Sequence, residues 1–143
     1  MRLLLINGNT DAAMTARMVT LARARAGADT SVEGVTARFG ARYIATRSAA
    51  AIAGHAVLDA LAHALAHAPA PDAVLLACFG DPGIGALREL SPAPVVGMAE
   101  ASMTRKASSP LTRRRLSSTA VASASAPIRA LPAGGERGGP ISP

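Results

Sequence analysis

Residues 75–83 read LLACFGDPG and contain Cys78, the only cysteine of this 143-residue chain. Residues 72–77 end as a short apolar run of strand length, and residues 82–90 carry the start signals of a helix. Cys78 is therefore predicted at the carboxyl end of a strand. If Asp81 caps the helix at its proline-led start, the free N–H groups of that helix point toward the sulfur and favour the thiolate. The alternative, which these residues leave open, is a small buried side chain that finishes a core strand.

Outward from this stretch, strand-like and helix-like patterns alternate along the chain. Strands are predicted at residues 2–6, 30–36, 72–77 and 94–97, and helices at residues 11–26, 48–68 and 82–90. Right-handed crossovers make this β-α-β-α-β-α-β order an α/β fold with an open parallel four-stranded sheet flanked by helices. Ligands bind beyond the carboxyl ends of the strands in such sheets, where residues 7–10 and 78–81 are expected to lie.

The helix ends and connections carry signals of their own. Asn9 or Thr10 can cap the first helix, and Gly27 can end it. Ser48 can cap the second helix. Residues 38–44 have no clean period, so we place them in a loop over the edge of the sheet, where loops often line pockets. The second helix has a predicted apolar side that consists of Ile52, Val57, Leu58, Leu61 and Leu65.

The composition indicates one globular domain with an aliphatic core. Half of the residues are hydrophobic but only 2% are aromatic, which suits helices packed closely on a parallel sheet. A single cysteine cannot form an internal disulfide, so a reducing compartment is expected. The apolar residues 3–6 are too few for a signal peptide or a membrane span. We therefore expect a soluble cytoplasmic protein without a membrane partner.

The net charge of +6 is confined to the end of the chain. Eight arginines balance eight acidic residues before Thr104, whereas seven basic residues stand against one acidic residue after it. Residues 104–143 are rich in Ser, Ala, Arg, Pro and Gly without a helix or strand period, so we predict a disordered tail after a domain at residues 1–103. Such a tail can contact nucleic acid, or it can be an out-of-frame reading of a GC-rich gene. We favour the second and expect no nucleic-acid partner, because spaced basic motifs and stacking aromatics are missing.

Two further motifs bear on ligand binding. Residues 80–85 are glycine-rich but lack the Gly-Lys-Ser/Thr of a phosphate-binding loop, so they indicate at most a site for a small anion such as a carboxylate. His63 and His67 have a metal-compatible spacing, yet no third ligand is placed to complete the set. No metal site is predicted.

Four segments match a known family in order and spacing. With residues 6–10, 38–44, 76–83 and 94–101, the chain resembles the Asp/Glu/hydantoin racemase family over about residues 1–103. Gly8 replaces the proline that is usual in the first loop of the family.

The resemblance implies one half of an enzyme with two pseudo-symmetric α/β halves and one catalytic cysteine from each half. Such enzymes invert a carbon next to a carboxylate or carbonyl without a cofactor, using a thiolate on one face and a thiol on the other. Cys78 matches the first of these cysteines. Asn9 and Thr10, with the backbone of Phe79 and Gly80, match positions that hold the substrate, an amino acid, a hydantoin or a related carboxylate or ring amide. A homo-oligomer is compatible with this reading.

The chain departs from the family at the second cysteine, which it lacks. A second half needs on the order of a hundred more residues with strands of their own, and the residues after Met103 offer none. We therefore expect an amino-terminal half with impaired racemisation, whose other end is truncated or frameshifted. The rival hypothesis is a half-domain without catalytic activity that binds a small carboxylate or a protein partner.

Overall fold

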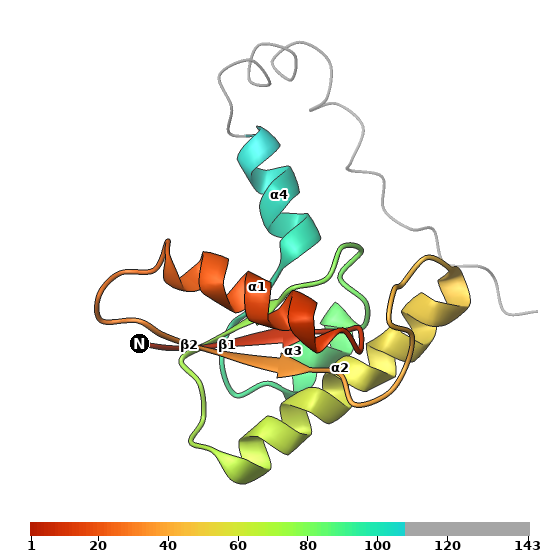
Figure 1. Ribbon diagram of the computed structural model, residues 1–143, viewed down its shortest axis with the longest axis horizontal. Helices are drawn as coiled ribbons and strands as arrows, with labels where there is room; N and C mark the ends of the chain where they lie inside the picture. Colours follow the sequence, from red (N-terminus) through yellow and green to blue (C-terminus); the bar gives the residue numbers. More distant parts are fainter. Residues whose placement is uncertain (108–143) are drawn as a thin grey trace, which may run out of the picture.

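The computed structural model describes residues 1–107, which form a three-layer α/β fold (Figure 1). Its four strands are parallel, as the sequence predicts, and they lie in the order β2-β1-β3-β4. The strands are β1 (Arg2–Asn7), β2 (Ser31–Thr36), β3 (Ala73–Leu76) and β4 (Val95–Gly97). The helices are α1 (Ala12–Arg23), α2 (Arg47–His67), α3 (Ile84–Leu90) and α4 (Met98–Ala107).

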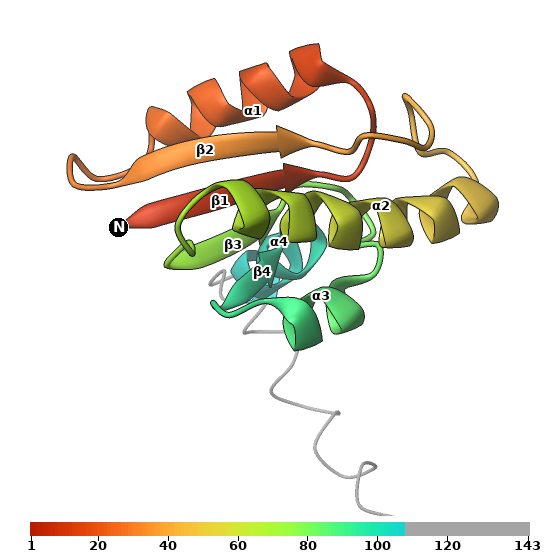
Figure 2. The ribbon, with the colours of Figure 1, turned by 90° about the horizontal axis from the view of Figure 1, so that it is seen from below.

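The two faces of the sheet are covered by different helices because side chains alternate along each strand. Leu4 and Ile6 of β1 belong to a core cluster with Val57 of α2 and Leu87 of α3. Leu5 faces the other way and belongs to a second cluster with residues of α1. Figure 2 shows α2 and α3 on one side of the strands and α1 on the other. Buried on both faces, β1 is a continuous apolar run rather than an alternating one.

Helix α2 is the longest described element and lies against the sheet through an alanine-rich side. Its buried residues include Ala56, Val57 and Leu61, whereas Ile52, predicted on the same side, is 48% exposed. Ile52 lies in the first turns of the helix, beside Gly40 of the 38–44 loop. A Cβ atom on Gly40 would lie 3.5 Å from its Cγ2 atom. Among the described helices, α2 alone is long and apolar enough to cross a membrane. Core helices pass this test too, and α2 contributes a full face to the core.

The caps of α1 and α2 differ from the predicted ones by one or two residues. The side chain of Asp11, not of Asn9 or Thr10, caps α1 by accepting a hydrogen bond from the backbone N–H of Met14. Thr46 caps α2 in place of Ser48. In both helices the side chain of the residue just before the first turn accepts a hydrogen bond from the backbone N–H three residues later. This is the geometry of an N-cap.

Helix α1 ends earlier than predicted, at Arg23 rather than near Ala26. The next residues form turns in which the N–H of Ala26 donates to the carbonyl of Ala22. Gly27 is not among the described residues with positive φ, so the helix does not use a left-handed glycine cap. The Arg23 guanidinium donates to the carbonyl of Val32 instead, which joins the end of α1 to β2.

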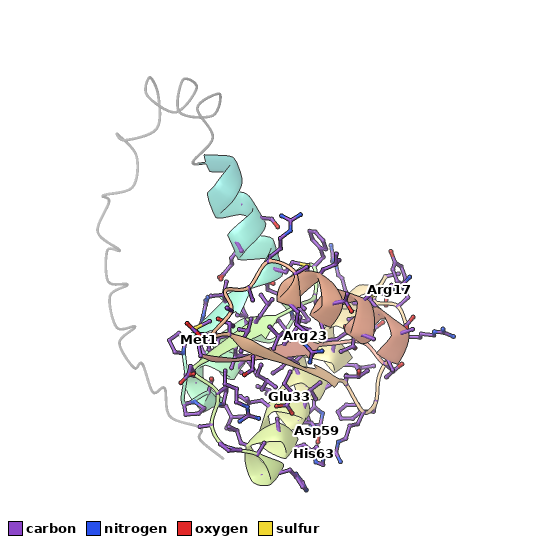
Figure 3. All side chains as sticks on the ribbon, turned by 60° about the vertical axis from the view of Figure 1, so that its left-hand side comes forward. Met1, Arg17, Arg23, Glu33, Asp59 and His63 are labelled. Atoms are coloured by element: carbon purple, nitrogen blue, oxygen red, sulfur yellow. The ribbon has the colours of Figure 1, made fainter. Side chains whose placement is uncertain are left out.

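The last described element runs past the predicted domain end at Met103. Helix α4 begins directly after β4 and continues to Ala107, so residues 104–107 are helical rather than part of a tail. Both Figure 1 and Figure 3 show α4 projecting away from the three-layer body. The predictions made for residues 108–143 lie outside the described residues.

Candidate functional site

Two loops meet at the carboxyl edge of the sheet because β1 and β3 are neighbours in register. Ile6 pairs with Leu76, and the N–H of Ala77 donates to the carbonyl of Ile6. The loops that follow these strands therefore lie side by side. A Cβ atom on Gly8 would lie 3.7 Å from the Cβ of Cys78, an ordinary van der Waals distance, so the two loops are close to contact at this point.

A cavity of about 370 Å³ opens where the two loops meet. Three predicted site residues, Asn9, Cys78 and Phe79, lie on its wall. Thr10 and Gly80 are not among the residues that line it, and the Thr10 N–H donates to the carbonyl of Ala41. The structure thus brings the cysteine and the asparagine of the site together, and leaves the substrate-holding role of Thr10 and Gly80 a prediction.

The rest of the cavity wall comes from residues that the sequence did not assign to the site. Met14 and Met18 extend from α1, and Met98 is the first residue of α4. Tyr43 and Ile44 come from the loop after β2, as expected of a pocket-lining loop. Met14 and Met18 are four residues apart, a spacing that is also typical of core packing. The signal for the cavity that the sequence offered was the position of this helix start next to the carboxyl edge of the sheet.

The orientation of the Asn9 side chain is fixed by its own loop. Its Oδ1 atom accepts hydrogen bonds from the backbone N–H of Asp11 at 2.9 Å and from the Asn7 amide at 2.8 Å. Because Oδ1 takes these donors, the Nδ2 group is the part of Asn9 that contacts Met14 on the cavity wall, 3.4 Å from its sulfur. Asn9 therefore presents a hydrogen-bond donor, not an acceptor, to the cavity.

Asn7 is a supporting residue that sequence reasoning missed. It is fully buried, and its Nδ2 donates to Asn9 and to the hydroxyl of Thr15. Its Oδ1 accepts the backbone N–H of Asn9. Thr15 is 2.7 Å from the hydroxyl of Thr36 on β2. A buried asparagine at a strand end must be satisfied by such partners, and this requirement was the signal available in the sequence.

Cys78 lies at the cavity but is a weak acid. The residue is 9% exposed and belongs to the core cluster under α2, and its sulfur lies 3.7 Å from the carbonyl oxygen of Phe79. Burial, followed by the negative charge of Asp81, raises the pKa of the thiol. The expected stabilisation of the thiolate is therefore wrong, since desolvation and a like charge both disfavour the charged form.

Asp81 does not cap the helix that follows Cys78. Helix α3 begins at Ile84 after Gly83, which has a φ of 71° and no side-chain cap. The Asp81 carboxylate instead accepts the backbone N–H groups of Ala99 and Glu100 in α4. An acidic group caps whichever free helix amides it can reach, and here these belong to a later helix.

The remaining candidates do not form a ligand site in the described part of the chain. His63 and His67 stack with ring centroids 4.1 Å apart on the exposed end of α2, where Figure 3 shows His63 on the side of the sheet opposite Arg17 of α1. No group of three potential metal ligands occurs among residues 1–107. The glycine-rich residues 80–85 do not line the cavity.

The sequence matches one described family and several of its characterised members. The pattern of the family described as Asp/Glu/Hydantoin racemase matches residues 3–130. The chain is 35% identical over 103 residues to the hydantoin racemase of Paenarthrobacter aurescens and 33% identical over 103 residues to that of Pseudomonas sp. (strain NS671). These alignments cover 72% of this chain but 43% and 41% of the two relatives.

Solved structures give the same result. The fold matches allantoin racemase from Klebsiella pneumoniae with a TM-score of 0.69 and 38% identity, and allantoin racemase from Pseudomonas fluorescens with a TM-score of 0.69 and 35% identity. Each match covers 73% of this chain and 42% or 43% of the other protein. The chain thus spans less than half the length of the proteins that it matches.

Proposed function

This chain belongs to the Asp/Glu/hydantoin racemase family, and we propose that it provides one of the two proton-transferring faces of a cofactor-independent racemase. The observation that carries the proposal is the shared cavity wall of Cys78 and Asn9 at the carboxyl edge of the sheet. A thiol can exchange a proton with carbon, and an amide donor beside it can stabilise the negative charge that develops on an adjacent oxygen.

Cys78 is proposed to act first as the proton donor. Its raised pKa keeps it in the thiol form near neutral pH. A base on the far face removes the proton of the stereogenic carbon, and the electrons of that C–H bond move into an enolate. Cys78 then delivers its proton to the near face and becomes a thiolate. In the opposite direction the thiolate removes the proton, so the same residue serves both directions.

Asn9 is proposed to hold the oxygen that receives the charge. Its Nδ2 group has two hydrogens and faces the cavity beside Met14. One of them can donate to a carbonyl oxygen next to the reacting carbon, and this bond strengthens as that oxygen becomes an enolate. The bonds from Asn7 and Asp11 to its Oδ1 keep the donor oriented before substrate arrives.

The proposed substrate is a neutral ring amide of the hydantoin type rather than a free amino acid. None of the described residues on the cavity wall carries a charge, and three of them are methionines. A free carboxylate would lose water there without gaining a cation, which is costly, whereas a ring carbonyl needs only a neutral donor. The characterised relatives are a hydantoin racemase in two bacteria and an allantoin racemase in two others, which supports this class.

The second proton-transferring group is proposed to come from outside the described residues. The sequence contains one cysteine, and a single thiol reaches one face of the substrate. Inversion by proton exchange needs an acid on one face and a base on the other. In this chain by itself the thiolate form of Cys78 is the available base. We therefore expect it to remove the substrate proton and return one from the resulting thiol to the same face, so that the proton is exchanged without inversion.

Protection of the thiol and hydrogen exchange test this proposal together. Alkylation of Cys78 by iodoacetamide is measured with 5-benzylhydantoin, with aspartate at the same concentration, and without ligand. We expect the hydantoin to slow alkylation and aspartate to leave it unchanged. In D₂O, NMR should show loss of the C5 proton of the hydantoin faster than with the Cys78→Ala variant or with buffer.

Each of the other outcomes would reject a different part of the proposed function. Protection without exchange would leave a binding module and reject the catalytic role of Cys78. Protection by aspartate instead of hydantoin would reject the proposed substrate class. If neither compound protects the thiol and no exchange occurs, the site does not bind these substrates at all.

A further inference from the structure

We propose that Asp81 is a positioning residue for Cys78, because its carboxylate connects the cysteine loop to the first turn of α4. Both carboxylate oxygens are used in this connection. Oδ1 accepts the N–H of Ala99 at 3.1 Å, and Oδ2 accepts the N–H of Glu100 at 3.0 Å. The residue is 8% exposed, so these charge-assisted bonds are shielded from water.

The backbone of Asp81 is also bonded to the cysteine loop. Its N–H donates to the carbonyl of Cys78 at 3.2 Å, which closes the turn that contains the cysteine. Its φ of 44° is left-handed, and Asp81 is the only non-glycine residue with positive φ in the described part of the chain. Such a conformation persists only where surrounding contacts hold it, and the two α4 bonds are those contacts.

Gly97, the last residue of β4, makes room for the carboxylate. A Cβ atom at this position would collide with the Asp81 carboxylate. Because α4 begins at the next residue, the end of β4, the start of α4 and the Asp81 side chain form one contact. Glycine at position 97 is therefore required by the position of the Asp81 carboxylate.

Helix α4 is joined to the cysteine loop at its first turn, where Asp81 accepts two backbone N–H groups. It follows β4 without an intervening loop, and it projects from the body in two views (Figures 1 and 3). Its first residue, Met98, forms part of the cavity wall with Cys78. Asp81 thus sets the distance between two parts of that wall, and a shift of α4 would move the thiol loop with it.

The charged groups around this contact are few. Asp81 acts on the sulfur of Cys78, whose pKa it helps to raise. Arg88 of α3 also senses the Asp81 charge but forms its ion pair with Glu100. The phenol of Tyr43 lines the same cavity. Removal of the Asp81 carboxylate should consequently change both the charge near the Cys78 sulfur and the position of the cysteine loop relative to α4.

Two substitutions and a control separate these effects in this chain. Asp81→Asn keeps a side chain that tolerates left-handed φ and keeps one acceptor oxygen, but it removes the charge. Asp81→Gly removes the side chain and relieves the backbone, so it should fold even if a bulkier variant does not. Asp59→Asn, on α2, removes a carboxylate that pairs with Arg38 and serves as the matched control.

Two quantities are measured for each variant: amide hydrogen exchange and the pH midpoint of Cys78 alkylation. Amide hydrogen exchange at Ala99 and Glu100 should become about tenfold faster in Asp81→Gly, as expected for loss of a bond to a charged acceptor. The pH midpoint of Cys78 alkylation should move to lower pH in both Asp81 variants, because a like charge is removed. Asp59→Asn should change neither.

Gly97→Ala separates position from charge, since it displaces the carboxylate and leaves it ionised. We expect faster exchange at Ala99 and Glu100 and a changed rate of Cys78 alkylation. If α4 exchanges faster in Gly97→Ala and Asp81→Gly while alkylation stays as in the unsubstituted chain, Asp81 only caps α4 and the positioning role is wrong. Equal behaviour of the Asp81 variants and Asp59→Asn would also overturn it.

This inference takes from the proposed function only that Cys78 is the reacting thiol. Alkylation and amide exchange are measured without substrate. A failure of hydantoin to bind would therefore reject the proposed function and leave the role of Asp81 to be decided by these variants.

Discussion

The position of Cys78 and its acid strength have different origins. The strand before it places the residue at the carboxyl edge of the sheet, beside the loop of Asn9. Its pKa, however, is raised by burial and by Asp81. A raised pKa suits a group that must hold its proton until the substrate is in place. The raised pKa therefore fits the proton-donor role that we propose for this thiol.

The raised pKa makes the stability of the fold depend on pH in the alkaline range. Below the pKa of an unfolded cysteine, about 8.5, both states hold the thiol proton and the stabilising contribution is complete. At higher pH the unfolded chain loses the proton first, so the free energy of unfolding should fall until pH passes the folded pKa. Urea unfolding between pH 7 and 10 measures this fall.

The Cys78→Ala variant is the control for that prediction, since all other titrating groups remain. The unsubstituted chain should lose more stability between pH 8 and 10, in the range set by the cysteine pKa, than the variant does. Identical pH dependence of the two proteins would show that the folded thiol is not harder to ionise.

Asn7 shows how one buried amide organises a site without touching the cavity. It donates to Asn9 and Thr15 and accepts the Asn9 N–H, so both ends of its amide and three neighbouring polar groups are satisfied inside the fold. The described residues leave no buried side-chain polar atom without a partner. The direction in which Asn9 presents its donor is therefore a consequence of hydrogen bonding behind it.

At the scale of elements, α2 and α3 approach each other through two glycines. A Cβ atom on Gly83 would lie 2.9 Å from both the Cα and the carbonyl oxygen of Gly54. Because α3 is only seven residues long, its position relies on this backbone contact and on Leu87, which is fully buried. The close approach also sets the direction in which the chain leaves the cysteine loop.

Gly83→Ala should therefore destabilise the protein strongly. The new methyl group meets the backbone of Gly54, and alanine resists a φ of 71°. Together these effects should lower the free energy of unfolding by about 2 to 4 kcal/mol, measured by urea denaturation.

Gly85→Ala is the matched control in the same helix. A Cβ atom there meets no atom within 4 Å, and alanine favours the helix, so stability should rise by about 0.5 to 1 kcal/mol. A similar loss in both variants would mean that α3 is sensitive to any added methyl group, and the close contact with α2 would not be the cause.

At the scale of the whole molecule, the proposed proton transfer needs a group on each face of the substrate, and Cys78 serves one face. The chain spans less than half the length of its characterised relatives. Tyr43 and Phe79, both on the cavity wall, are each 75% exposed. Exposed apolar side chains that gather at one place often mark a surface that contacts a ligand or another protein.

We therefore predict that this chain alone does not invert an enantiopure hydantoin. Polarimetry of L-5-benzylhydantoin should show the same slow loss of rotation with the protein and with its Cys78→Ala variant, because one thiol returns a proton to the face from which it came. Faster loss of rotation with the unsubstituted chain would mean that a second acid–base group lies within it.

The sequence by itself determined the order of strands and helices, the parallel sheet and the place of Cys78 at its carboxyl edge. These follow from apolar runs and periodicities that are local to each element. The helix ends were predicted less accurately, because several neighbouring residues can cap the same helix. The observed caps, Asp11 and Thr46, lie one or two positions from the predicted ones.

Only the tertiary structure decided what surrounds the thiol. Asp81 caps a helix that begins 17 residues later in the sequence instead of the one beside it. Met98, Tyr43 and Ile44 reach the cavity from separate segments. Burial and charge around a side chain are sums over such distant contacts, and a local pattern contains no information about them. For this reason the sequence located Cys78 correctly and predicted the wrong direction for its pKa.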